Sequence, residues 1–295
     1  MNDMGVKEKK KWSKKKKILV IVLSIVLFLF VAVICAGAAA LHWYCTVSDY
    51  EIVSAQQITN DDTKIIAHRG FRAVAPENTL PAFEEAGKNG FWGAECDIYR
   101  TKDGVWVVQH DVNTYRMMDF TKSIEKCTYD ELLEHNTDNG NNIENYPDLK
   151  ICSLDEYLKA CQDYSMTAVI ELKGKNNTEH YDEIITTVDK YDCDVVYISF
   201  HEENLYTLRK LTDAPMYYLV YTIDDEAIKI AKDIGNCGLD FDGSKEGNYE
   251  NDAAAIKMAQ AEGLSLGAWT IDDLDTMKTL VEFGVEYITT DCITY

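Results

Sequence analysis

Short apolar runs alternate with helical patterns along the chain from residue 63 onward, an arrangement typical of parallel βα units. Eight runs predict strands: KIIAHR from Lys64, GAECDI from Gly93, AVIELK from Ala168, VVYISF from Val195, PMYYLV from Pro215, GLDFDG from Gly238, LSLGAWT from Leu264 and YITTD from Tyr287. The helices predicted around them cover residues 79–90, 153–164, 179–191, 202–211, 225–234, 249–263 and 272–284. Eight such units predict an α/β fold, the TIM (β/α)8 barrel, whose functional groups gather at the carboxyl ends of the strands.

One strand-like run, VWVVQH at residues 105–110, does not fit the βα rhythm. Only Lys102, Asp103 and Gly104 separate it from the second strand, which is too short for a parallel crossover of about a dozen residues. The Asp-Gly pair predicts a β-hairpin that sets His110 roughly opposite Cys96. The segment at about 111–150 then forms a small insertion after strand 2 of the barrel.

Three carboxylates stand near the ends of the second and third strands. Glu95 and Asp97 point to the same face because side chains alternate along a strand, and Glu171 ends the neighbouring strand. Carboxylates without sulfur or clustered imidazoles favour a hard cation, so the sequence predicts one divalent ion, Ca²⁺ or Mg²⁺. The alternative is that they only form ion pairs with Arg69 and Lys173, although that pairs three anions with two cations.

Cations and imidazoles occupy the neighbouring strand ends. Arg69 and Lys173 are suited to phosphate, as a planar fork and as a point charge. His68 and His110 titrate near neutral pH and can act as general acid and base. Together with a divalent cation, these groups predict binding and cleavage of a phosphodiester. Surface or structural roles are expected for the remaining histidines: His42, His135, His180 and His201.

At these motifs the sequence closely resembles the glycerophosphodiester phosphodiesterase family. The motifs occur in the family's order: HRG at 68–70, APENT at 75–79, ECD at 95–97, TKDGVWVVQHD at 101–111, IELKG at 170–174, ISF at 198–200, AWT at 268–270 and GVEYITTD at 284–291. The resemblance implies hydrolysis of a glycerophosphodiester to glycerol 3-phosphate and an alcohol. Attack by the glycerol 2-hydroxyl, through a cyclic phosphate, is one route that it implies.

The resemblance also implies a role for each candidate residue. It implies catalysis by His68 and His110, metal binding by Glu95, Asp97 and Glu171, and substrate binding by Arg69, Lys173 and Trp269. Trp269 would line the glycerol side of the pocket, and its alternative is a core position. Asn78 and Thr79 are interpreted as caps of the following helix. Asp111 is expected to orient the hairpin, or alternatively to hold the tautomer of His110.

The N-terminal region predicts a membrane anchor. Residues 1–17 contain eight Lys and carry a formal charge of +6, and residues 18–41 are uncharged and long enough to cross a bilayer of about 30 Å. The positive-inside rule places this tail in the cytoplasm and everything after residue 41 outside. The alternative is a cleaved signal peptide ending near the small residues 36–40. A linker at 42–62 then precedes the catalytic domain at 63–295.

The net charge argues against one class of partner, and the cysteine pattern indicates where those residues lie. The net charge of −21 leaves −27 on the chain after residue 17, which disfavours a nucleic-acid partner. The resemblance implies a small glycerophosphodiester or lipid-derived substrate as the partner. Nine cysteines without a CxxC pair are interpreted mainly as buried apolar residues. The leading hypothesis is a membrane-anchored, metal-dependent glycerophosphodiesterase. The alternatives are a related phosphodiesterase for lysophospholipid, sphingolipid or glycerophosphate polymer, and a catalytically inactive envelope-binding scaffold.

Overall fold

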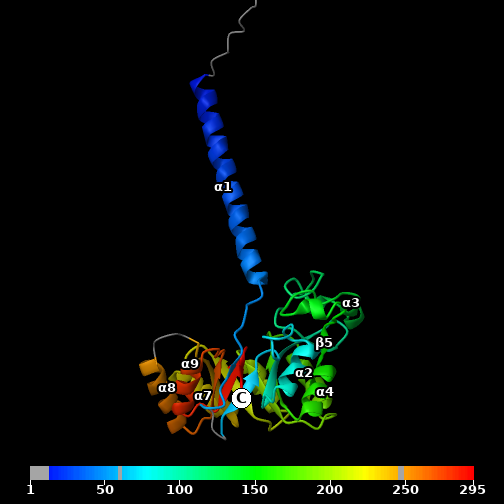
Figure 1. The fold of residues 1–295 in the computed structure, drawn as a ribbon, viewed down its shortest axis with the longest axis vertical. Helices are drawn as coiled ribbons and strands as arrows, with labels where there is room; N and C mark the ends of the chain where they lie inside the picture. Colours follow the sequence, from blue (N-terminus) through cyan, green and yellow to red (C-terminus); the bar gives the residue numbers. More distant parts are fainter. Residues whose placement is uncertain (1–12, 59–61, 245–248) are drawn as a thin grey trace, which may run out of the picture. The chain divides into compact units, whose positions relative to one another are not determined.

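The computed structural model describes residues 13–58, 62–244 and 249–295, and the chain divides into two compact units that meet between Thr46 and Val47. The first unit consists of helix α1, Lys14–Cys45, drawn in blue in Figure 1. Its segment Lys14–Leu41 contains an 18-residue window with a mean hydropathy of 3.5 and has the length needed to cross a membrane, a test that N-terminal signal sequences also pass. The predicted span at 18–41 falls within this helix. Most of the predicted cytoplasmic tail, residues 1–12, lies outside the described residues.

Eight parallel strands close into a barrel in the second unit. They follow one another around it as β2 (Lys64–Ala67), β11 (Tyr287–Thr290), β10 (Leu266–Trp269), β9 (Cys237–Asp242), β8 (Met216–Val220), β7 (Val195–Ser199), β6 (Thr167–Leu172) and β3 (Gly93–Arg100). Pairing of Ile66 with Gly93 joins β2 to β3 and completes the closure. The predicted TIM barrel and all eight predicted strands are therefore confirmed. Outside the barrel, β1 (Val53–Ser54) pairs with β12 (Ile293–Thr294).

Helices cover the outside of the barrel, with α2 and α4 on one side in Figure 1 and α7, α8 and α9 on the other. Their bounds are α2 (Leu80–Lys88), α4 (Leu154–Tyr164), α5 (Tyr181–Val188), α6 (Glu202–Arg209), α7 (Asp225–Ile234), α8 (Tyr249–Ala261) and α9 (Leu274–Glu282). Local sequence sets several starts: Ser153 and Glu156 form a capping box at α4, and Asp224 and Asp273 cap α7 and α9. All seven predicted helices are confirmed, with ends that differ by a few residues at most.

The predicted hairpin is also confirmed. Strand β4 (Trp106–Val108) runs antiparallel to β3, with Ile98 opposite Val108, and the Gln109 N–H donates to the carbonyl oxygen of Asp97 at 2.9 Å. Extending this register by two pairs beyond Ile98 and Val108 would set His110 opposite Cys96, the position expected for it. A short strand, β5 (Cys152–Ser153), pairs with the other edge of β4.

The insertion between β4 and β5 folds around a core of its own. It contains two 3₁₀ helices, η1 (Ile124–Lys126) and η2 (Ile143–Asn145), and helix α3 (Tyr129–Leu133), which Figure 1 shows as a lobe beside the barrel. Its buried apolar side chains, which cluster with Val107 of β4, are Met117, Met118, Ile124, Cys127, Leu132 and Ile151. Because this cluster is separate from the main core, the lobe packs its own side chains over the hairpin.

Alternation along each strand divides the barrel side chains between two environments. Cys96 of β3 faces outward into the core shared with the helices, as predicted, where it lies with Tyr157 of α4. The inside of the barrel holds a smaller apolar cluster that includes Val169, Ile198 and Leu219. Glu95 and Asp97 therefore turn their carboxylates toward the inside of the barrel.

Candidate active site

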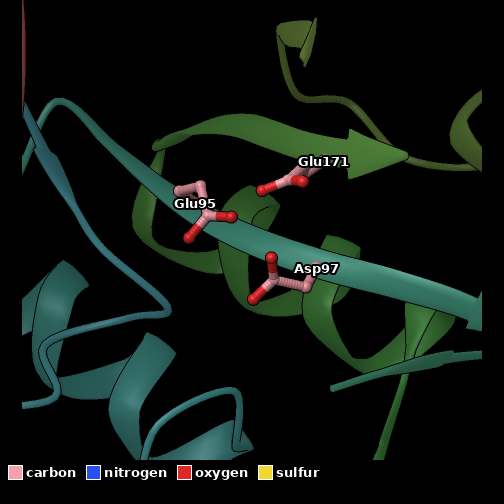
Figure 2. A group of neighbouring side chains, drawn as sticks. All are labelled: Glu95, Asp97 and Glu171. Carbon is pink, nitrogen blue, oxygen red and sulfur yellow. The ribbon is translucent and has the colours of Figure 1, made fainter. Parts of the chain in front are cut away.

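Three buried carboxylates meet where β3 and β6 lie side by side. Asp97 of β3 is paired in register with Glu171 of β6, and Glu95 lies two residues earlier on β3. Their exposed fractions are 2% for Glu95, 1% for Asp97 and 7% for Glu171. Figure 2 shows the three carboxylates turned toward the same space, and one oxygen of each lies within 4.8 Å of the others.

The three crowded carboxylates have pKa values shifted in different directions. Burial, followed by the charges of Asp97 and Glu171, raises the pKa of Glu95 well above its usual range. Burial likewise raises the pKa of Glu171 to about 7, although Lys173 opposes the shift. Burial also acts on Asp97, but the positive charges of Lys173, His110 and Arg69 outweigh it and hold its pKa well below the usual range. The raised pKa values of Glu95 and Glu171 indicate that the nearby cations do not fully compensate the three negative charges.

The two expected phosphate-binding cations lie against this cluster. Lys173 Nζ is 2.9 Å from an Asp97 oxygen and 2.8 Å from a Glu171 oxygen. The Arg69 backbone N–H donates to Glu95 at 2.8 Å, whereas its guanidinium approaches Asp97 only to 3.6 Å. The ion-pair alternative is thus realised for Lys173 in this structure. It leaves Glu95 with a main-chain donor and without a close side-chain cation among the described residues.

Each expected catalytic histidine contacts a carboxylate through Nδ1. His68 Nδ1 lies 2.6 Å from Oδ1 of Asp291, and Tyr50 donates its hydroxyl to the other oxygen of Asp291 at 2.7 Å. Burial lowers the pKa of His68, and the charge of Asp291 opposes that shift. His110 Nδ1 lies 3.0 Å from Oδ1 of Asp111, a contact that fits the second of the two roles expected for Asp111.

A buried acid not singled out in the sequence, Glu77, organises the arginines beside the site. Its carboxylate lies 2.9 Å from Arg69, 2.8 Å from Arg72 and 2.5 Å from Arg116. Arg116 belongs to the insertion and also contacts Asp111 at 2.7 Å. The insertion is thereby connected to the loop before α2 and to the residue that contacts His110.

The prediction that Asn78 and Thr79 only cap α2 is wrong. Thr79 is the N-cap residue, but its side chain makes no capping hydrogen bond and its hydroxyl donates instead to the Pro76 carbonyl at 2.5 Å. Asn78 has a φ of 56°, a left-handed conformation that Asn tolerates, and its amide donates to Asp97 at 2.7 Å. A hydrogen bond to an ionised carboxylate is stronger than one between neutral groups, so the Asn78 side chain points toward Asp97 and does not cap the helix.

One cavity of about 210 Å³ brings the expected site residues together. Its lining includes His68, Arg69, Glu95, His110, Glu171, Lys173, Ile198, Phe200, Leu219, Tyr221, Asp240, Trp269 and Thr289. Asp97 is absent from this lining and lies behind it, against Lys173. The rings of Phe200, Tyr221 and Trp269 form an aromatic wall, with centroids 5.4–5.7 Å apart. His135, His180 and His201 lie outside the cavity lining, and the side chain of His42 is outside the described part of the chain.

Comparisons with known proteins identify the family of this chain. The model of the glycerophosphoryl diester phosphodiesterase family matches residues 68–294. A human protein named glycerophosphodiester phosphodiesterase 1 is 33% identical over 153 residues, which are 51% of this chain and 46% of that protein. This chain thus spans about half the length of these mammalian relatives. A glycerophosphodiester phosphodiesterase of Caldanaerobacter subterraneus is 26% identical over 246 residues, covering 78% of this chain and 94% of that protein.

Solved structures show the same fold. A phosphodiesterase of Oleispira antarctica, in complex with the product sn-glycerol-3-phosphate, has a TM-score of 0.70 and 25% identity, covering 81% of this chain and 95% of that one. A glycerophosphodiester phosphodiesterase of Parabacteroides distasonis has a TM-score of 0.64 and 28% identity, covering 79% and 94%.

Proposed function

This chain belongs to the glycerophosphoryl diester phosphodiesterase family, and from that premise we propose that it hydrolyses glycerophosphodiesters to glycerol 3-phosphate and an alcohol. The observation that carries the proposal is one cavity that is lined by two imidazoles, by Arg69 and Lys173, and by Glu95 and Glu171 of the carboxylate cluster. The Oleispira antarctica phosphodiesterase, solved with sn-glycerol-3-phosphate, supports this choice of product. The substrate is then a small, lipid-derived phosphodiester.

Glu95, Asp97 and Glu171 would hold one divalent cation. The fit is chemical, because all three donors are hard oxygens within 4.8 Å of one another, as Ca²⁺ and Mg²⁺ require. The raised pKa of Glu95 and of Glu171 marks a cluster whose anions need further positive charge. When bound, the cation would neutralise the phosphodiester and stabilise the charge that develops on it.

His68 and His110 would move the protons of the reaction. A carboxylate beside Nδ1 keeps the proton on that nitrogen, so Nε2 of each ring is the atom that exchanges protons with substrate. One imidazole would accept the proton of the attacking hydroxyl as the new P–O bond forms. The other would donate its proton to the leaving alcohol as the old P–O bond breaks. If the glycerol 2-hydroxyl attacks first, water opens the cyclic phosphate with the two roles reversed.

Arg69, Lys173 and Trp269 would position the substrate. Arg69 and Lys173 line the cavity with positive charge beside the carboxylates, where they can contact the phosphate oxygens. The Lys173 ammonium lies against Asp97 and Glu171 in this structure and would turn from them to contact a bound phosphate. Trp269 and its aromatic neighbours would pack against the apolar face of the glyceryl group.

Helix α1 would anchor the enzyme in a membrane. Residues 1–17 would stay in the cytoplasm, residues 18–41 would span the bilayer, and residues 63–295 would act outside after the linker at 42–62. Protease added to intact cells is expected to release a fragment with the activity of the barrel. Protection of the barrel from that protease would contradict this topology.

The reaction is tested by phosphorus NMR of the full chain in detergent, with glycerophosphocholine and lysophosphatidylcholine as parallel substrates and either cation present. Conversion of glycerophosphocholine to glycerol 3-phosphate supports the proposal. Cleavage of the lysophospholipid alone, or a final product that remains a cyclic phosphate, would favour the related lipid phosphodiesterase instead.

A further inference from the structure

Asp240 lies in the cavity but has no part in the mechanism above. It belongs to β9, only 6% of it is exposed, and it lines the same cavity as His68 and Glu95. Its Oδ1 is buried and has no hydrogen-bond partner among the described residues. A buried polar atom without a protein partner is uncommon in a folded protein, and a water, an ion or a ligand group can complete its hydrogen bonds.

A glycine on the neighbouring strand leaves space for the Asp240 carboxyl group. Gly267 is its partner in register on β10, and a Cβ added there would lie 2.8 Å from Oδ1 of Asp240. The Trp269 indole N–H donates to the main-chain oxygen of Asp240 at 3.2 Å, which ties the aromatic wall to the same residue. Apolar side chains of Ile198 and Leu219 line the cavity with it. The carboxyl is therefore held beside apolar side chains, without a hydrogen-bond partner for Oδ1 among the described residues.

The position of β9 indicates which part of a substrate would reach Asp240. In the order of strands around the barrel, β9 is three strands from β6 and four from β3, which carry the carboxylate cluster. A substrate whose phosphate lies beside Lys173 and Arg69 would therefore extend across the cavity toward β9. The terminal hydroxyl is the part of a glyceryl group that lies farthest from phosphorus.

We propose that Asp240 binds the terminal hydroxyl of the glyceryl group and so selects phosphodiesters that carry glycerol. This inference rests on the function proposed above. Burial, with a smaller effect of Glu171, raises the pKa of Asp240 to about 8, so at neutral pH the carboxyl is mostly protonated. A protonated carboxyl both donates and accepts, which matches a hydroxyl better than a cationic or anionic group.

The test compares two substrates on matched variants of the full chain in detergent. One substrate is glycerophosphocholine, and the other is its deoxy analogue with a methyl group in place of the terminal hydroxymethyl group. Asp240→Leu removes the hydrogen bond at similar volume, and Asp240→Asn keeps a donor and an acceptor. Asp242→Asn is the control, because its carboxylate lies on the same strand, accepts from Ser244 and does not line the cavity.

The wild type is expected to prefer glycerophosphocholine to the analogue by roughly 10- to 100-fold in kcat/KM, the loss typical of one buried hydrogen bond left unmade. Asp240→Leu should lose activity on glycerophosphocholine by a similar factor while changing little on the analogue. Asp240→Asn and Asp242→Asn should keep most of the preference. Thermal unfolding midpoints check that each variant is folded.

Two outcomes would overturn the inference while leaving the proposed function in place. One is a wild type that cleaves both substrates equally well, and the other is an Asp240→Leu variant that loses activity equally on both. If Asp240→Leu does not fold, Asp240→Ala takes its place, and it is expected to lose the preference for glycerophosphocholine while Asp240→Asn keeps it. A wild type that cleaves neither substrate with any divalent cation would refute the proposed function, and this inference with it.

Discussion

Replacing Asp291 by Asn is expected to lower kcat while leaving the protein folded. Asp291 Oδ1 lies 2.6 Å from His68 Nδ1, and the pair is largely buried, so the bond is charge-assisted. The Asn oxygen can still accept a hydrogen bond from Nδ1–H, but an uncharged amide cannot stabilise a positive imidazolium as a carboxylate does. A hydrogen bond to a charged group contributes about 1.5–3 kcal/mol. At about 1.4 kcal/mol per factor of ten, its loss corresponds to a decrease of roughly 10- to 150-fold.

The same substitution should shift the pH profile in a direction that the structure determines. Burial lowers the pKa of His68, and Asp291 partly offsets this by favouring the protonated ring. Without that carboxylate, the pKa of His68 falls further. The limb of the kcat/KM profile that reports His68 therefore moves to lower pH, whether His68 acts as the acid or as the base.

The assay follows glycerol 3-phosphate release from glycerophosphocholine across roughly pH 5 to 9, the range in which histidines titrate. Tyr50→Phe is the matched control, because it removes the 2.7 Å hydrogen bond to the other oxygen of Asp291 but keeps the charge beside His68. That control should leave the limb in place. A normal kcat with an unmoved profile in Asp291→Asn would refute the role assigned to this pair.

Three further predictions follow from other contacts. Glu171→Gln should raise the cation concentration for half-maximal activity by roughly tenfold or more, because each ~1.4 kcal/mol of lost binding free energy raises the dissociation constant tenfold. Metal titration after EDTA treatment measures this concentration. Arg116→Leu leaves the buried Glu77 with fewer cations and should destabilise the protein by about 3 kcal/mol in urea unfolding; no change in the midpoint would contradict the network. Leu158→Ala, at a fully buried site on α4, should cost about 2–5 kcal/mol with an unchanged m-value, and a smaller loss would show that the core collapses into the space.

Patterns local in sequence predicted most of this fold. The apolar runs predicted every barrel strand because a buried parallel strand is apolar on both faces, and the Asp103-Gly104 pair marked the hairpin. Side chains at strand ends converge in any such barrel. For that reason Glu95 and Glu171 could be placed at one site before any distance between them was known.

Contacts between distant segments could not be predicted in the same way. Asp291 reaches His68 because β11 lies beside β2 when the barrel closes, and 223 residues separate the two in sequence. Arg116 meets Glu77 through the fold of an insertion without a strong pattern of its own. Asp240 sits in a run that resembles any core strand, and only the three-dimensional structure shows that its carboxyl faces the cavity. Roles for the site residues stay predictions until variants are measured.

The most direct test of the central claim is glycerol 3-phosphate release from glycerophosphocholine by the full chain in detergent. It is measured with EDTA, then with Ca²⁺ or Mg²⁺ restored, and beside Glu95→Gln. The account predicts release that EDTA abolishes, that one of the two cations restores and that Glu95→Gln largely loses. Release that persists in EDTA, or no release with either cation, would contradict it.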